Sequence, residues 1–326
     1  MAAYAAVLAG ITYVAQTEDP VGGVRNVEVI VKDPSGGWSD PVAGTLTVVA
    51  VNDVPVVDLD IGSGGSDFAT GFLEGQLPER LYYGAISDLD DTQLVGVTVV
   101  ITDVQDVGDE VLAADTGNTP ISSDWDASSA TLTLTGSADL VDYQSVLGSL
   151  TYAHPSEDPT EGDRHVTVTV DDGQDTATAT ATVTVAAVND EPVADLNGSG
   201  DGRDYLTQFT EGAGPISAFA DEAAVVDPDA ASLDWMTMYI TQTIDTSEEG
   251  LSWDLGGTAV SATGDAQSVS FDGPASVADF TAVLDSIAYD HTGDPSASLV
   301  RWVKVQVSDG VDTGPLSTAV ITNASN

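Results

Sequence analysis

Apolar and polar residues alternate with a period of two along much of the chain. Valine alternates with threonine over residues 166–170, and alanine or valine alternates with threonine over residues 177–185. This period puts apolar side chains on one face of a strand and threonine on the other. The turn sequence DDGQD joins the two runs, so they predict an antiparallel hairpin. Short strands with frequent turn signals indicate a β-sandwich.

Two segments break the strand pattern. SADLVDYQSVL and SVADFTAVL each have apolar residues spaced for one short amphipathic helix. We expect Ser137 and Ser276 to cap these helices, because serine accepts hydrogen bonds from the free amides of a first turn. Leu140, Tyr143 and Leu147 are expected to pack inward.

The sequence repeats itself at an interval of about 137 residues. The phrase VAVNDVPVVDLDIGSGG begins at Val49 and returns as AAVNDEPVADLNGSGDG from Ala186, 137 residues later. Segments beginning at Tyr4, Tyr143 and Phe280 also align. Such self-similarity indicates tandem units. We therefore expect the C-terminal half of a first repeat at 1–51, a second repeat at 52–188 and a third at 189–326.

Residues 1–51 supply only the rear strands of a sandwich. Strands without partners expose their edges and one apolar face. Either the sequence is an excerpt of a longer protein, which we favour, or these strands are completed by a neighbouring chain.

Charge narrows the set of partners. The chain has 53 acidic and 7 basic residues, a net charge of −46, and aspartate outnumbers glutamate by 41 to 12. Nucleic acid and anionic membranes both require basic residues, so neither is expected as a partner. The negative charges repel one another when such a chain becomes compact. Either cations neutralise the charges or the protein works in high salt. The excess of aspartate favours calcium. Cysteine is absent, which excludes disulfides and thiol chemistry.

Hairpin topology predicts where the carboxylates meet. The turn before the last strand of a unit and the end of its second strand should lie at the end where the unit begins, beside the Asn-Asp linker. Ca²⁺ takes six to eight oxygen ligands, whereas Mg²⁺ retains its waters and zinc prefers His or Cys. The second junction would use Glu74, Asn189, Asp190, Asp227, Asp229 and Asp309 as ligands. The first would use Asn52, Asp53, Asp88, Asp90 and Asp172, with weaker or fewer ions because no counterpart of Glu74 precedes it.

The order of these motifs resembles the cadherin-like tandem repeats of large bacterial surface proteins and RTX-type adhesins. The resemblance lies in Val-Asn-Asp-x-Pro, in Glu-Gly after the first strand, in Asp-x-Asp after the second, and in Asp-Gly in the last hairpin. It covers essentially the whole chain. It implies an all-β fold of cadherin-like or Ig-like sandwiches in an elongated array, with calcium stiffening the linkers. The third unit ends in ITNASN, residues 321–326, without the linker phrase, so no third junction is assigned.

Two functional hypotheses follow. The first is an extracellular stalk or spacer of an adhesin-like surface protein. The second is a binding module for a glycan or a cell-surface protein, or a subunit that self-assembles with like repeats into a layer, sheath or filament. The five tryptophans fall at different positions in the units, so they form no repeating aromatic platform, which favours the stalk. We expect no enzyme activity, because carboxylates that recur with the unit indicate architecture rather than one active site.

Overall fold

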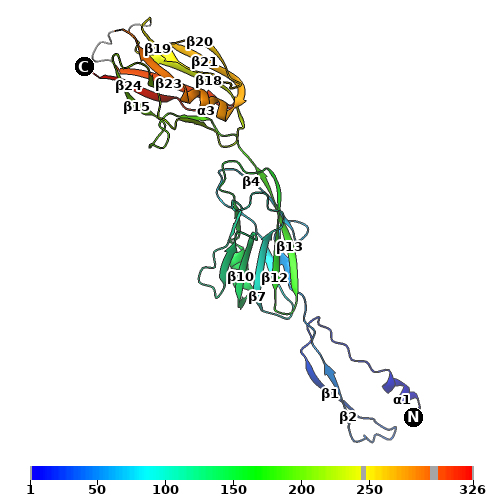
Figure 1. Ribbon diagram of the computed structural model, residues 1–326. Coiled ribbons are helices and arrows are strands. Elements are labelled where there is room, and N and C mark those ends of the chain that lie inside the picture. The colour runs from blue at the N-terminus through cyan, green and yellow to red at the C-terminus, as the bar shows by residue number, and fades with distance from the viewer. Residues whose placement is uncertain (1, 244–246, 294–299, 325–326) are drawn as a thin grey trace. The chain divides into compact units, whose positions relative to one another are not determined.

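The computed structural model describes residues 2–243, 247–293 and 300–324. It divides the chain into two compact units, Met1–Ala186 and Ala187–Asn326 (Figure 1). The regular structure of both is mainly β-strand, which confirms the predicted all-β fold of tandem sandwiches. No helix within the described residues is long and apolar enough to cross a membrane.

The first unit carries two short helices and thirteen strands in the described residues. In chain order these are α1 (Ala2–Ala9), β1 (Gly23–Val29), β2 (Val42–Val48), β3 (Val56–Asp58), β4 (Phe68–Leu73), β5 (Glu79–Arg80), β6 (Ala85–Ser87), β7 (Gln93–Ile101), β8 (Val111–Ala113), β9 (Ser122–Asp126), β10 (Thr131–Asp139), α2 (Leu140–Leu147), β11 (Thr151–Ala153), β12 (Gly162–Asp171) and β13 (Thr176–Ala186).

The second unit repeats the plan of residues 52–186. Its elements are β14 (Val193–Asp195), β15 (Tyr205–Thr210), β16 (Ile216–Ser217), β17 (Ala224–Val226), β18 (Ser232–Thr241), β19 (Glu249–Ser252), β20 (Ser261–Asp265), β21 (Ser268–Ser276), α3 (Val277–Asp285), β22 (Ala288–His291), β23 (Val300–Ser308) and β24 (Ser317–Ala324).

The sheets have the same strand order in both units. A six-stranded sheet runs β4-β13-β12-β7-β10-β9 in the first unit and β15-β24-β23-β18-β21-β20 in the second. A three-stranded sheet, β5-β11-β8 or β16-β22-β19, forms the opposite layer, and a two-stranded sheet, β3-β6 or β14-β17, lies at the start of each sandwich. The strand β4 joins β13 in parallel, while β12 and β13 form the predicted antiparallel hairpin.

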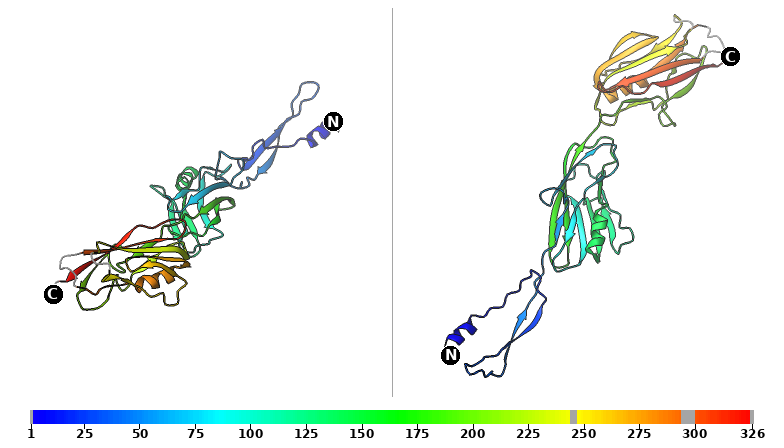
Figure 2. Two further views of the ribbon diagram at one scale, coloured as in Figure 1. Left: turned by 90° about the horizontal axis from the view of Figure 1, so that it is seen from above. Right: turned by 180° about the vertical axis from the view of Figure 1, so that it is seen from behind.

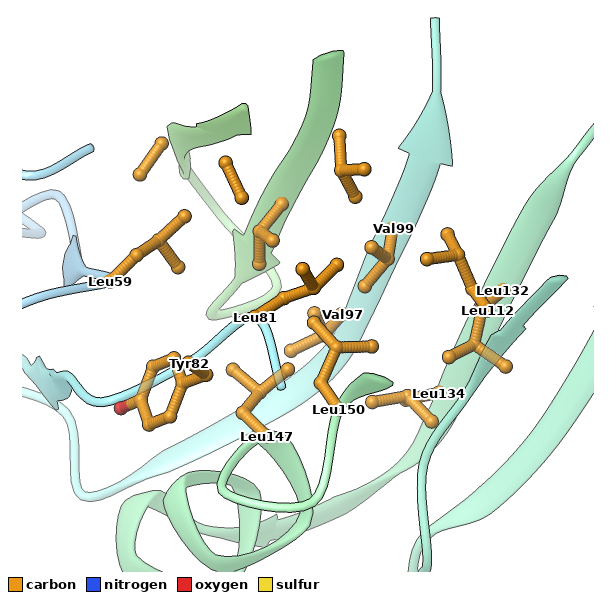
Figure 3. Close-up of a cluster of buried hydrophobic side chains, with 14 of the residues drawn as sticks. Leu59, Leu81, Tyr82, Val97, Val99, Leu112, Leu132, Leu134, Leu147 and Leu150 are labelled. Carbon is orange, nitrogen blue, oxygen red and sulfur yellow. The ribbon is translucent and has the colours of Figure 1, made fainter. Parts of the chain in front are cut away.

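The core follows directly from the period of two. Val166, Val168 and Val170 on β12 are fully buried, whereas the threonines between them are only partly buried. Figure 3 shows Leu81, which directly follows β5, in one cluster of buried side chains with Val97 of β7 and Leu147 of α2. Burial of these side chains is the main stabilising term for a chain without disulfides.

The helices pack as expected, but one of the two predicted caps is wrong. Tyr143 and Leu147 are buried and Leu140 packs partly buried against the core. Ser276 caps α3 by accepting a hydrogen bond from the amide of Asp279. Ser137 does not cap α2: β10 continues to Asp139, so the Ser137 hydroxyl donates to the side chain of Gln93 instead.

Residues 2–51 form a smaller structure. They fold into α1, an extended stretch, and the two-stranded antiparallel ribbon β1-β2, which both views of Figure 2 show as a long hairpin. Many of the large apolar side chains of this segment are exposed, in contrast to their counterparts in the two sandwiches.

Candidate metal centre

In the first unit, the linker asparagine connects the start of the sandwich to its last hairpin. The Nδ2 of Asn52 donates to Oδ2 of Asp172 and to Oδ2 of Asp175, both at 3.0 Å, and also to the carbonyl oxygen of Asp53 at 3.0 Å. Asp172 and Asp175 belong to the turn between β12 and β13. Two carboxylates from one turn are therefore held beside the linker by one amide group.

The following aspartate connects the linker to the loop after β6. The backbone amide of Asp53 donates to Oδ1 of Asp90 at 3.1 Å. Oδ1 of Asp88 accepts from the backbone amides of Asp90 and Asp91, both at 3.1 Å. The Asp88 carboxylate thus holds the Asp-x-Asp loop, and the Asp90 carboxylate of that loop contacts the linker.

The second unit repeats the asparagine arrangement. The Nδ2 of Asn189 donates to Oδ2 of Asp309 at 2.8 Å and to Oδ2 of Asp312 at 3.1 Å, and it also contacts the carbonyl oxygen of Asp190 at 3.0 Å. The amide of Asp190 donates to Oδ2 of Asp229 at 3.3 Å. Every one of these contacts has its counterpart in the first unit, so the cluster is a property of the repeat.

Several carboxylate oxygens in these clusters are buried without a hydrogen-bond partner among the described residues. They are Oδ2 of Asp53 and Oδ2 of Asp88 in the first unit, and Oδ2 of Asp227 and Oδ1 of Asp229 in the second. An isolated buried carboxylate oxygen is costly because it has lost its hydration. A hard cation is the partner that such a set of oxygens fits best.

The pKa values divide the carboxyl groups into two kinds. Burial raises the pKa of Asp53, and the negative charge of Asp90 raises it further. Burial also raises the pKa of Asp227, with a further contribution from the adjacent Asp229 carboxyl. Both shifts have the direction expected where burial and neighbouring carboxylates oppose the ionised form.

The hairpin aspartates behave in the opposite way. Burial works against the charged form of Asp172, but hydrogen bonds from Asn52 and from the amides of Asp175 and Gln174 outweigh it and hold the pKa below its ordinary value of 3.8. The same balance, with Asn189 as the side-chain donor, lowers the pKa of Asp309. Both shifts favour the ionised form of these two carboxyl groups.

The structure groups ten of the eleven predicted residues into two sets, one in each unit. Glu74 was predicted with the second junction, and it lies in the first unit. It follows β4, its amide donates to the carbonyl of Ala186 at 3.0 Å, and its buried carboxylate lies within 4.8 Å of the Glu157 carboxylate. A metal-binding role for Glu74 stays a prediction.

Sequence reasoning missed Asp175 and Asp312, which share the linker amide with the predicted aspartates. A signal existed, because Asp-x-x-Asp occurs in the last turn of both units, at Asp172 and at Asp309. The first cluster also has a contact that the second lacks among described residues: the Nε2 of Gln174 donates to Oδ1 of Asn52 at 2.6 Å, and valine occupies the equivalent position 311.

Buried arginine–glutamate pairs were also missed. The Nε of Arg164 lies 2.7 Å from Oε1 of Glu110, and the Nε of Arg301 lies 2.6 Å from Oε2 of Glu249, with both pairs shielded from solvent. Arg164 also contacts Asp106 at 3.1 Å, and the buried His154 lies 2.9 Å from the same carboxylate. Because a guanidinium already neutralises this acidic group, it is an internal ion pair and not a candidate metal centre.

Comparison with known proteins gives structural neighbours only. No protein-family model matches the chain, and no curated protein matches its sequence. Among solved structures, Protocadherin Gamma B2 extracellular cadherin domains 1–5 has 17% identity and a TM-score of 0.30, covering 93% of this chain and 46% of that one. The Protocadherin gammaB7 EC3-6 cis-dimer structure has 14% identity and a TM-score of 0.32, covering 93% and 58%. Human CDH23 EC21-23 has 15% identity and a TM-score of 0.28, covering 79% and 67%.

All three TM-scores are below 0.5, so the likeness to cadherin extracellular repeats carries no argument about this chain. The chain spans about half the length of the protocadherin chains it matches. What the two clusters bind has to be inferred from their own geometry.

Proposed function

We propose that this chain is a calcium-stiffened extracellular spacer of an adhesin-like surface protein, with calcium bound at the Asn-Asp cluster of each unit. The observation that carries the proposal is the recurrence of one all-oxygen cluster in two units, each with buried carboxylate oxygens that lack a hydrogen-bond partner among the described residues. The order of motifs, which resembles bacterial cadherin-like repeats, supports a bacterial cell surface as the setting.

The ligand set fits calcium better than other ions. Carboxylate and backbone oxygens converge at each cluster, with no histidine or cysteine among the residues that form it. Calcium accepts such irregular sets of six to eight oxygens, and zinc prefers nitrogen and sulfur. In the first unit the holding residues would be Asn52, Asp53, Asp88, Asp90 and Asp172; in the second they would be Asn189, Asp190, Asp227, Asp229 and Asp309.

The spacer role follows from where the clusters lie in the sequence. Each Asn-Asp pair belongs to the segment that leads into a sandwich, and each cluster ties that segment to a loop and to a hairpin of the same unit. Neutralising the carboxylates would let this segment keep one conformation. A chain of such units would bear force and hold an attached domain at a distance rather than perform chemistry, which suits a stalk.

Thermal unfolding with and without calcium tests the proposal. A ligand that binds only the native state stabilises it by RT ln(1 + [L]/Kd), and extracellular calcium modules have Kd values of about 10⁻⁴–10⁻³ M. We expect about 10 mM CaCl₂ to raise the Tm of EDTA-treated protein by about 5 °C. Equal concentrations of MgCl₂ should give a much smaller rise. A Tm that does not respond to calcium at constant ionic strength would refute calcium binding.

A further inference from the structure

We propose that the apolar face formed by α1, residues 11–14, β1 and β2 is a docking surface for the front half of a further unit of this same kind. The partner would supply a strand like β7 to pair with β1, and a buried glutamate to pair with Arg25. This inference concerns residues 2–51 alone and does not depend on calcium binding.

The evidence begins with strand register. In β1 and β2, Arg25 lies opposite Leu46 and Val27 opposite Gly44. In β12 and β13, Arg164 lies opposite Val183 and Val166 opposite Ala181. Residues 25 and 164, and residues 27 and 166, are each 139 apart, so the short hairpin reproduces the long one residue by residue. The helix α1 likewise precedes β1 as α2 precedes β12.

Residues of the short hairpin and their counterparts in the complete sandwich differ in how far other strands cover them. Val27 is 41% exposed, whereas its counterpart Val166 is 0% exposed and pairs in the sheet with Ile101 of β7. Tyr13 is 50% exposed, whereas its counterpart Tyr152 is 0% exposed. A contiguous apolar face of this size is rarely left open on a soluble protein and marks an interaction site.

An open groove runs along the same face. Its volume is about 670 Å³, and its apolar lining includes Leu8, Ile11, Tyr13, Val27, Val42 and Leu46. The counterparts of Leu8 and Ile11 in the complete first sandwich are Leu147 and Leu150, which are buried in its core. The groove therefore has the position of a sandwich core from which one layer is missing.

Charge complementarity identifies the partner further. Arg164 and Arg301 are fully buried and each pairs with a glutamate from the start of a short strand of the opposite layer, β8 or β19. Arg25 occupies the same strand position, but its guanidinium donates to the nearby carbonyl of Val21 instead, and Arg25 remains partly exposed. The partner that fits this surface must bring both an apolar strand and a carboxylate.

A second copy of this chain does not fit these requirements. Its own front-half strands, β4 and β7 in one unit and β15 and β18 in the other, are already paired with rear strands of the same unit. The face of residues 2–51 therefore needs a front half that is not already covered, and the two sandwiches show its pattern.

Supplying that front half tests the proposal. Residues 52–139, the front half of the first sandwich, would be fused directly ahead of Met1 of the full chain, so that residue 139 leads into position 1 as it leads into Leu140 in the native unit. We expect loss of hydrophobic-dye binding and protease cleavage within residues 2–51 slowed more than about tenfold. Residues 189–276, fused in the same way, provide a second front half in case the first pairs poorly.

Matched substitutions separate docking from general effects of fusion. Val27→Ala and Arg25→Ala should leave the Tm of the original chain unchanged, but each should increase protease cleavage of residues 2–51 in the fused protein. Val166→Ala, the same position in a complete sandwich, should lower the Tm of both proteins.

Two results would overturn the proposal. One is that neither fused front half reduces dye binding or protects residues 2–51 from protease. The other is that the original chain dimerises with increasing concentration in light-scattering measurements and that Val27→Glu abolishes the dimer, because the surface would then bind a second copy.

Discussion

At the scale of single residues, the two clusters combine carboxyl groups with opposite needs. Hydrogen bonds from the linker asparagine stabilise the charges of Asp172 and Asp309, whereas the charges of Asp53 and Asp227 are destabilised by burial and by neighbouring carboxylates. If the clusters hold calcium as proposed, the first kind would supply ionised ligands, and the bound cation would stabilise the charges of the second kind. A substitution that deletes one destabilised charge should therefore have opposite effects with and without calcium.

Asp227→Asn tests this sign reversal. The asparagine oxygen can still accept from the amide of Ala230, as Oδ1 of Asp227 does at 2.9 Å. The folded pKa of Asp227 is raised above its ordinary value of 3.8, so its contribution to stability is present at low pH and is lost as pH rises through the folded pKa. In EDTA the variant should therefore become more stable than wild type as pH rises from about 4 to about 7. With calcium it should bind fewer ions by titration calorimetry.

Asp265→Asn is the matched control for this variant. Asp265 is an exposed turn residue of the same unit, and its Oδ1 also accepts two backbone hydrogen bonds, from Gln267 and Ser268. It should not change the calcium stoichiometry. If both variants bind as much calcium as wild type, Asp227 is not a ligand.

Residue-level prediction succeeded where contacts follow the repeat. Hairpin topology brought Asp172 to Asn52, 120 residues earlier in the chain. The alternation also indicated that Arg164 is buried, because residues 164, 166 and 168 lie on the same face of the strand. Its partner Glu110 was not predictable, because it lies 54 residues away in a short segment without a pattern.

At the scale of elements, the length of a strand determined whether the sequence could predict it. The hairpin of β12 and β13 was evident because ten and eleven residues give several periods of alternation. The strands β5 and β16 have only two residues each, too few for any period to appear. These short strands form because they pair with the other strands of the layer opposite the six-stranded sheet. That is a tertiary constraint. The missed cap at Ser137 has the same origin, since β10 extends past it.

The buried ion pair that links β12 to the start of β8 should dominate the stability of the first sandwich among its charged contacts. Glu110→Gln leaves the guanidinium of Arg164, which is 0% exposed, without its closest carboxylate. Removal of one partner from a buried pair costs about 3–5 kcal/mol, because the remaining charge stays desolvated. Urea unfolding of the full chain should show this loss in the transition of the first unit.

The exposed pair of His165 and Asp103 provides the control in the same sandwich. Their side chains are 50% and 41% exposed and approach to 2.6 Å. Asp103→Asn should cost less than about 1 kcal/mol, because exposed ion pairs contribute little. If Glu110→Gln costs no more than Asp103→Asn, the buried pair does not stabilise the sandwich in the way its geometry implies.

At the scale of the whole molecule, a net charge of −46 has to be reconciled with two well-packed cores. Two general solutions exist: cations bound at specific clusters, or screening of all charges by salt. The clusters of Asn52 and Asn189 favour the first solution because they recur with the same partners. Acidic surfaces adapted to high salt have no need for carboxylate oxygens buried together.

The two solutions differ in their response to sodium and calcium. The Debye length is about 30 Å at 0.01 M salt and about 3 Å at 1 M, so 1 M NaCl screens repulsion between exposed charges throughout the chain. In EDTA we expect NaCl to raise the Tm gradually. At fixed ionic strength, millimolar CaCl₂ should raise the Tm further, in a saturable way, and 1 M NaCl should then weaken the apparent calcium affinity by screening the clusters. Differential scanning calorimetry across both titrations provides the measurement, with MgCl₂ as the control for divalent charge. Equal Tm shifts from calcium and magnesium, or a calcium effect fully reproduced by NaCl, would favour the salt-adapted surface instead.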